Sequence, residues 1–120
     1  MTRTDPHSAD LAERCGPLAL ARFFRVLGDP TRVRLLEALL DGERSVSELV
    51  QLVGAPQSRV SNHLACLKWC RFAESERRGR RVFYRVTDPQ VRELIRLARA
   101  MASENSDYLE SCTRVGPGWI

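Results

Sequence analysis

The chain has 120 residues, 43% of them hydrophobic, and 19 Lys and Arg against 15 Asp and Glu give a net charge of +4. This length leaves little room for a separate catalytic module, so we expect one domain over residues 1–120, with its core shared with a partner subunit. No apolar run is long enough to cross a bilayer and no signal peptide is visible, so we expect a cytoplasmic protein without membrane contact. Four cysteines in such a chain indicate thiol chemistry rather than disulfides.

The first third of the chain predicts two helices. Residues 8–27 have apolar side chains at helical spacing, but a Gly-Pro pair interrupts them, so we expect a lead-in turn and then a helix from Pro17. Asp29 and Pro30 are typical of an N-cap and a first helical residue, and Gly42 is expected to end that helix. Its buried face is predicted to hold Val33, Leu36, Leu39 and Leu40.

A short helix and a second helix follow with a tight turn between them. Ser45 and Glu48 have the spacing of a capping box, and Gly54 is expected to end the short helix. Pro56 is predicted to be the first residue of the next helix. The buried stripe of that helix is expected to be Val60, Leu64 and Leu67. This order predicts a helix-turn-helix.

Beyond residue 72 the hydrophobic period changes to that of strands, which predicts a β-hairpin with a basic tip. The tip arginines are Arg77, Arg78, Arg80 and Arg81. Asp88 and Pro89 then predict the start of a long last helix, whose apolar stripe suits a dimer interface. The stripe consists of Val91, Leu94, Ile95, Leu97, Ala98 and Met101. The predicted fold class is mainly α with a small β-hairpin, a winged helix-turn-helix.

The second helix of the helix-turn-helix presents small and amide side chains opposite its buried stripe. Such residues can approach the major groove closely and bond base edges or phosphates. The basic hairpin can reach phosphates beside that helix. Either feature alone also occurs as ordinary solvated surface, but both in this order predict DNA binding. The predicted DNA-binding residues on the helix are Gln57, Ser58, Arg59, Ser61 and Asn62.

Four blocks, "LGDPTRVRLLEALL", "SVSELVQLVG", "QSRVSNHLACLK" and "GRRVFYRVTD", resemble the ArsR/SmtB family of winged-helix repressors in the same order. They cover roughly residues 18–100. The resemblance implies a homodimer joined through an N-terminal arm (1–28) and a C-terminal helix and tail (89–120). It also implies that the metal-free dimer binds operator DNA with inverted symmetry and releases it when an inducer binds.

Two metal sites known in that family lack their ligands here. Ser45 and Ser47 occupy the segment where one branch has a Cys-x-Cys pair, and hydroxyls are poor ligands for soft metals. Asp88 has no histidine partner on the last helix, which disfavours the zinc, nickel or cobalt site of another branch. His63 belongs to the "SNHL" block, where we expect it at the edge of the core rather than on a metal.

The remaining candidate ligands are thiols. Cys66 and Cys70 are four residues apart, so they lie on one helix face and can share one large ion. Two thiolates leave a soft ion under-coordinated, and Cys112 in the tail is the natural third donor. This pattern resembles the cadmium- and lead-sensing branch of the family, in which the tail cysteine completes the site across the dimer interface. Cys15 is either a fourth ligand or an idle thiol.

The expected inducer is therefore a soft divalent ion, Cd²⁺ or Pb²⁺, with Hg²⁺ as an alternative. A thiol redox or persulfide switch is a further alternative, as is a winged-helix regulator without an inducer. An enzyme is not expected, because the sequence has no Gly-rich phosphate loop and no nucleophile paired with a base. Trp69, between the two cysteines, is expected to pack under the hairpin or against the tail.

Overall fold

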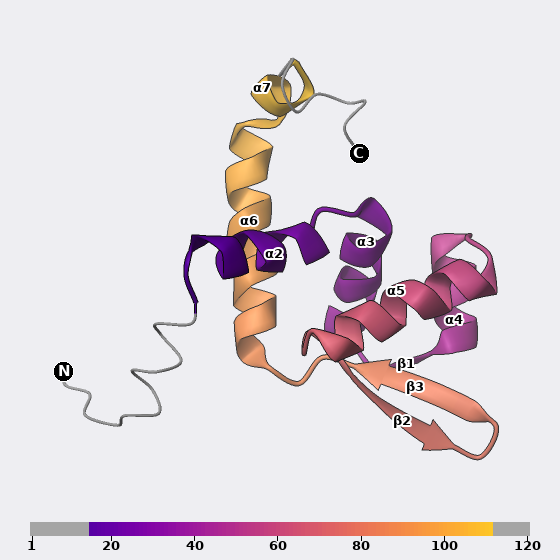
Figure 1. Cartoon of the computed structure of the whole chain (residues 1–120). Coiled ribbons are helices and arrows are strands. Elements are labelled where there is room, and N and C mark those ends of the chain that lie inside the picture. Colours follow the sequence, from indigo (N-terminus) through magenta and orange to yellow (C-terminus); the bar gives the residue numbers. More distant parts are fainter. Residues whose placement is uncertain (1–14, 112–120) are drawn as a thin grey trace, which may run out of the picture.

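The computed structural model describes residues 15–111, and Figure 1 shows a helical body from which a hairpin and a long helix project. The helices are α2 (Pro17–Val26), α3 (Pro30–Leu40), α4 (Val46–Val53), α5 (Gln57–Trp69), α6 (Pro89–Glu104) and α7 (Ser106–Ser111). The strands are β1 (Arg44–Ser45), β2 (Glu74–Arg78) and β3 (Arg81–Arg85). None of the helices in this part of the chain is long and apolar enough to span a membrane.

The helix starts follow the predicted capping residues. The Asp29 carboxylate accepts hydrogen bonds from the backbone N–H groups of Thr31 and Arg32, and Pro30 is the first residue of α3. Ser45 and Glu48 form the predicted capping box at the start of α4. These local signals are sufficient because each joins residues no more than three positions apart.

The α4–α5 turn confirms the predicted helix-turn-helix, with one correction. Gly54 ends α4 in the left-handed region at φ 73°, a conformation that glycine adopts without a Cβ clash. Pro56 is the N-cap of α5 rather than its first residue, because its ψ of 145° is extended. The helix that reads DNA in the predicted scheme, here called the reading helix, is therefore α5, Gln57–Trp69.

The end of α5 is held tightly. The N–H of Phe72 donates to the Leu67 carbonyl at 2.8 Å and the N–H of Arg71 donates to the Lys68 carbonyl at 3.0 Å, which is a Schellman motif. Arg71 occupies the left-handed position with φ 69°, where a non-glycine residue costs about 1 kcal/mol. Phe72 and Leu67 are both buried, so their packing offsets that cost and fixes the chain just after Cys70.

The sheet has the order β1-β3-β2 and is antiparallel throughout. β2 and β3 form the predicted hairpin, called the wing below, with Arg78 opposite Arg81 and Gly79 at the turn with φ 64°. The sequence analysis did not predict β1. Two residues are too few to show a strand's alternation, and β1 exists because Arg44 pairs with Tyr84 across the sheet.

One core joins α3, α4, α5 and the wing. Its fully enclosed side chains are Leu35, Leu36, Leu49, Val60, Leu64 and Leu67, with Leu39 next to them. The predicted stripe of α5 is confirmed. The predicted face of α3 is partly wrong, since Val33 and Leu40 are only half-buried while Leu35 is completely buried. The buried arc is centred on Leu35, Leu36 and Leu39, and Val33 lies at its edge, where it lines a pocket between α3 and α6.

Two helices keep apolar side chains exposed within one chain. On α2, Phe24 is 54% exposed, and on α6, Leu97 and Met101 are 51% and 58% exposed. Figure 1 shows α2 crossing α6, which runs away from the body. The last helix of the prediction is divided in two, because α6 ends at Glu104 with Asn105 as its C-cap and α7 follows as a separate helix.

Candidate nucleic-acid interface and thiol site

The reading helix divides into a buried face and a polar face, as the sequence predicted. Its stripe of three apolar side chains is fully enclosed, which holds the helix rigidly against α3 and α4. The polar residues Gln57, Ser58, Arg59 and Asn62 are exposed, and Ser61 is half-buried. A rigid helix with short polar side chains outward has the shape and chemistry that a major groove accepts.

The wing arginines are not equivalent. Arg78 binds Glu43 through two hydrogen bonds of 2.8 Å and Glu76 through one of 3.0 Å. Arg81 donates to the Ser45 hydroxyl at 3.1 Å and lies 5.0 Å from the centre of the Phe83 ring. These two side chains therefore hold the wing in place rather than extending freely.

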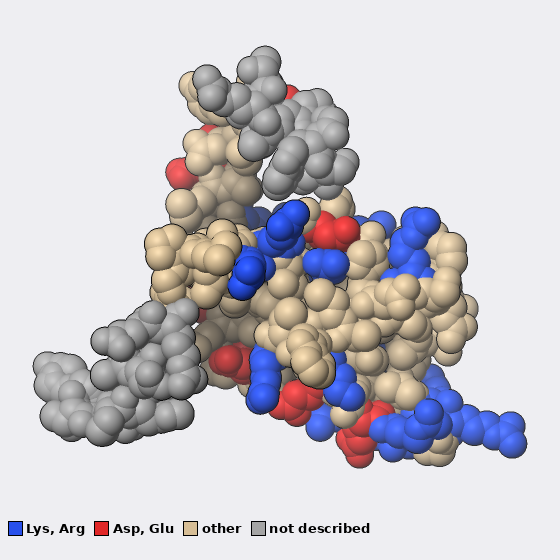
Figure 2. Space-filling model, viewed as in Figure 1, with Lys and Arg blue, Asp and Glu red and all other residues tan. Residues whose placement is uncertain are grey.

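Arg77 and Arg80 are the available cations of the wing. Arg77 makes one long contact of 3.5 Å to the Gly79 carbonyl. Arg80 has no hydrogen bond or ion pair to any of residues 15–111. Figure 2 shows the basic patch at the end of the wing, with acidic side chains beside it. The cationic tip predicted from the sequence thus consists of two available and two engaged arginines.

Glu43, just before β1, joins arginines of both wing strands in one ionic cluster. It accepts hydrogen bonds from Arg78 and, at 3.3 Å, from Arg85. The hydrogen bond from Arg78 is the main reason that the pKa of Glu43 is lowered, and the same arginine lowers the pKa of Glu76. Sequence reasoning missed Glu43, because its partners lie 35 and 42 residues further along the chain.

The two thiols predicted as ligands are brought together. Cys66 and Cys70 lie at the end of the reading helix, where the Cys70 N–H donates to the Cys66 carbonyl at 2.9 Å. Burial raises the pKa of Cys70, and the charge of Cys66 and a hydrogen bond with it raise it further, while Arg32 opposes these effects. A soft metal ion binding this pair therefore has to displace a proton from Cys70.

The pair supplies two donors of the same soft type, which fits a thiophilic ion but does not complete its coordination. Within residues 15–111, no three His, Cys, Asp or Glu side chains come together as a metal site. Cys15 is exposed at the start of α2 and is not brought to the pair within one chain. Cys112, the predicted third donor, lies outside the described residues.

His63 is engaged with its neighbours. Its Nδ1 accepts a hydrogen bond of 3.2 Å from Arg32 Nε, and its Nε2 lies 4.0 Å from the Asp29 carboxylate. It is half-buried, as expected for a residue at the edge of the core. Trp69 is 86% exposed, so it does not pack under the wing. The other expectation, packing against the tail, concerns residues outside the described range.

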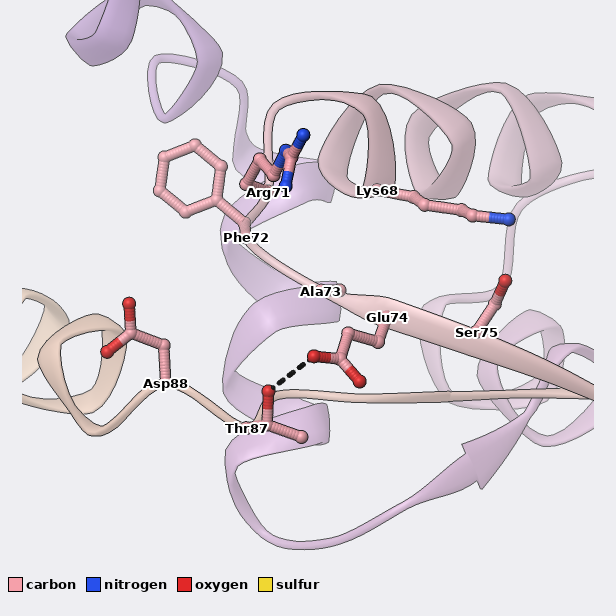
Figure 3. Close-up of a pocket in the computed structure, with 8 residues that line it drawn as sticks. All are labelled: Lys68, Arg71, Phe72, Ala73, Glu74, Ser75, Thr87 and Asp88. Carbon is pink, nitrogen blue, oxygen red and sulfur yellow. Dashed lines mark hydrogen bonds between the residues drawn. The ribbon is translucent and has the colours of Figure 1, made fainter.

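A cavity of about 560 Å³ lies between the end of α5, the start of β2 and the segment that enters α6 (Figure 3). Lys68 reaches over it from α5, and the Thr87 hydroxyl donates to the Glu74 carboxylate at 2.8 Å. Glu74 also pairs with Arg85 at 3.7 Å. These contacts connect the wing to the segment that enters α6, and the cavity lies between these two parts of the chain.

A helix-turn-helix followed by a basic hairpin on a shared core defines a winged-helix DNA-binding protein. The class of this chain is therefore a winged-helix regulator, with a thiol pair at the end of its reading helix.

Comparison with known proteins assigns the family. Residues 29–75 match the family described as bacterial regulatory protein, arsR family. The chain is 47% identical over 102 residues to a probable mercury resistance operon repressor of Streptomyces lividans, covering 85% of this chain and 81% of the relative. It is 41% identical over 90 residues to the regulator CmtR of Mycobacterium bovis, covering 74% and 76%. The chain belongs to the ArsR family, whose members are transcriptional regulators and not enzymes.

A solved structure agrees with this assignment. The homodimeric winged helix-turn-helix DNA-binding domain of a possible ArsR-family regulator from Mycobacterium bovis, determined by NMR in solution, is similar with a TM-score of 0.66. The two share 28% identity over 87% of this chain and 91% of that chain. The winged helix-turn-helix fold predicted from the sequence is confirmed.

Proposed function

We propose that this protein is a cytoplasmic repressor that binds operator DNA as a metal-free homodimer and releases it when a soft thiophilic metal ion binds. Cd²⁺ or Pb²⁺ is the proposed inducer. The observation that carries the proposal is the position of the two thiols, since Cys66 lies in the last turn of the helix that presents the polar face to DNA and Cys70 is its C-cap. An ion bound there acts directly on the reading helix.

The proposed operator has inverted symmetry, because a homodimer presents two equivalent reading helices about one DNA turn apart. The exposed apolar side chains of α2 and α6 supply the dimer surface in this proposal. On each reading helix the contacts to bases and phosphates come from Gln57, Ser58, Arg59, Ser61 and Asn62. Arg77 and Arg80 contact phosphates, and Arg78 and Arg81 orient the wing.

The proposed metal site consists of Cys66 and Cys70 of one subunit together with Cys112. By resemblance to the cadmium- and lead-sensing branch, Cys112 is proposed to come from the other subunit of the dimer. Three thiolates suit cadmium and lead, whereas mercury is also stable with two or three. The similarity to a mercury resistance repressor supports mercury as the alternative inducer. Similarity to CmtR supports the metal-responsive class in general.

Titration of the reduced protein tests the proposal. Cd²⁺, Pb²⁺ and Hg²⁺ are added separately, thiolate-to-metal absorption is recorded, and DNA affinity is measured by fluorescence anisotropy on a labelled palindromic operator. We expect absorption and DNA release with at least one of the three ions, and their relative affinities identify the inducer. Release by an oxidant or a persulfide donor, with none of the ions acting, would instead select the thiol switch, for which the Cys66–Cys70 contact is the supporting observation.

The two classes of wing arginine predict different salt dependence of DNA binding. Each phosphate contact contributes about −0.9 to the slope of log K against log salt. Because a dimer carries each residue twice, Arg80→Ala is expected to make this slope less negative by roughly two. Arg78→Ala leaves the slope close to wild type, since its guanidinium already binds Glu43 and Glu76. Anisotropy titrations at several salt concentrations measure both, and equal changes in the two variants would contradict this division.

A further inference from the structure

We propose that the end of the reading helix is a further DNA-contact surface, which binds the sugar-phosphate backbone beside the bases that its first turns read. The surface consists of Lys68, Trp69 and Arg71 and is called the end patch below. The inference rests on the proposed function only in that α5 faces DNA, and it does not depend on the inducer. No residue of the end patch was selected from the sequence as a DNA contact.

Trp69 continues the polar face of α5. It follows Ser58, Asn62 and Ala65 by eleven, seven and four residues, and all four side chains are exposed. At about 100° per residue, Trp69 points within about 20° of the direction of Ser58. Its indole is 86% exposed and offers a flat apolar surface with one N–H donor. The partner that meets Ser58 and Asn62 therefore also meets Trp69, if it extends that far along the helix.

The length of α5 decides which part of DNA lies there. Ser58 and Trp69 are separated by about 16 Å along the helix axis. The major groove is about 12 Å wide, and helix-turn-helix proteins place the N-terminal residues of the reading helix on base edges. With its first turns in the groove, the last turn of α5 lies at the groove edge, beside the backbone. Backbone contacts position a protein on DNA and carry no direct sequence information.

Two cations flank Trp69 and give the end patch its charge. Lys68 and Arg71 are exposed, and neither side chain has a hydrogen bond or ion pair to the part of the chain that the structure describes, residues 15–111. Figure 3 shows both side chains extending from the end of α5. Cations that hold no acidic partner are the groups that displace counterions from phosphates.

The nearby carboxylates do not neutralise the end patch, because each has a partner of its own. Glu74 accepts a hydrogen bond of 2.8 Å from the Thr87 hydroxyl and pairs with Arg85 at 3.7 Å. Asp88 caps α6 by accepting a hydrogen bond of 2.9 Å from the Gln90 N–H. The charge of the end patch thus remains complementary to DNA.

Arg71 occupies a backbone position that favours glycine. Its φ of 69° lies in the left-handed region, which glycine adopts at a helix end without a Cβ clash. An arginine is strained there, and what it adds over glycine is a cation two residues from Trp69. Such an outlier indicates a functional side chain.

A hollow of about 590 Å³ beside Trp69 provides room for the backbone. It is lined by Ala65, Lys68, Trp69, Arg71 and Tyr84. Because Ala65 carries only a methyl group, the indole stands as one wall of this hollow. The cations attract a phosphate, the indole face packs on a deoxyribose, and the indole N–H donates to a phosphate oxygen.

Two features of the sequence make the test direct. Trp119→Phe leaves Trp69 as the only tryptophan, and Lys68 is the only lysine. In the metal-free reduced protein we expect acrylamide to quench Trp69 fluorescence as it does for an exposed indole, and acetic anhydride to acetylate Lys68. A saturating operator duplex, or an unrelated duplex of the same length, is expected to abolish both reactions.

Variants then separate apolar contact from charge. Trp69→Ala is expected to weaken binding to both duplexes by the same factor, about tenfold. Lys68→Gln makes the slope of log K against log salt less negative by roughly two, because a dimer carries the residue twice. Arg96→Gln is the matched control, since this exposed cation on α6 already pairs with Glu93, and it keeps the wild-type slope. Anisotropy titrations at several salt concentrations measure all three.

The end patch is overturned if Trp69 is already shielded in the DNA-free dimer, by the tail or the partner subunit. Full quenching with DNA bound, a loss confined to the operator duplex, or equal slopes in Lys68→Gln and Arg96→Gln overturns it as well. In each of these cases the proposed function stands. If the wild type binds neither duplex, the proposed function fails and the end patch fails with it. Should Trp69→Ala not fold by circular dichroism, the shielding measurements decide, because they keep Trp69.

Discussion

Cys70→Ser is expected to lower the affinity of the reduced protein for Cd²⁺ by about two orders of magnitude and to abolish DNA release at wild-type inducer concentrations. Structural zinc sites with four ligands have apparent binding free energies of about 10–16 kcal/mol, roughly 3 kcal/mol for each ligand, which is about two orders of magnitude in affinity. A hydroxyl does not replace a thiolate on a soft ion. Absorption titration and operator anisotropy measure both effects.

Cys15→Ser is the control for this prediction. Cys15 is an exposed thiol at the start of α2, and it is not placed with the pair in one chain. It is expected to keep wild-type Cd²⁺ affinity and release, which would identify Cys15 as an idle thiol. An equal loss in both variants would make Cys15 a fourth ligand, and wild-type behaviour of Cys70→Ser would contradict the metal site.

Leu64→Ala is expected to lower the free energy of unfolding by about 3 kcal/mol, within the range for a fully buried leucine. Leu64 is completely enclosed on the reading helix, and α5 packs against both α3 and α4 around it. Removing its side chain leaves a cavity that the surrounding leucines cannot fill without leaving their own contacts. DNA affinity falls as well, because the polar face of α5 is positioned by this core.

Leu52→Ala is the matched control, because Leu52 lies on α4 and is 48% exposed. We expect a change within about 0.5 kcal/mol. Both variants are measured by urea unfolding at one protein concentration, since the stability of a dimer depends on concentration. Similar losses in the two variants would show that the core described for a single chain does not determine stability.

The sequence was most informative where the determining contacts are short. Asp29 and Ser45 start their helices through bonds to residues two or three positions away, and the spacing of Cys66 and Cys70 places both thiols on one helix face. The stripe of α5 was also predicted correctly, because a helix packed on one side has a regular period. Val33 and Leu40 were assigned wrongly because helical spacing alone does not fix where the buried arc of α3 is centred, and tertiary contacts centre it on Leu35, Leu36 and Leu39.

The sequence by itself was enough to predict the winged fold and the family. Helix caps and hydrophobic periodicity predict the fold, and the order of the four sequence blocks indicates the family. The tertiary structure alone decided which cations stay available. Arg78 and Glu43 are 35 residues apart in the sequence, and Arg32 and His63 are 31 residues apart. No local sequence pattern therefore predicts either contact. Arg32 meets His63 because α3 packs against α5, whereas Arg78 meets Glu43 because β1, which follows Glu43, joins β3 and β2 in one sheet. Each charge thereby acquires a partner that spacing along the chain cannot reveal.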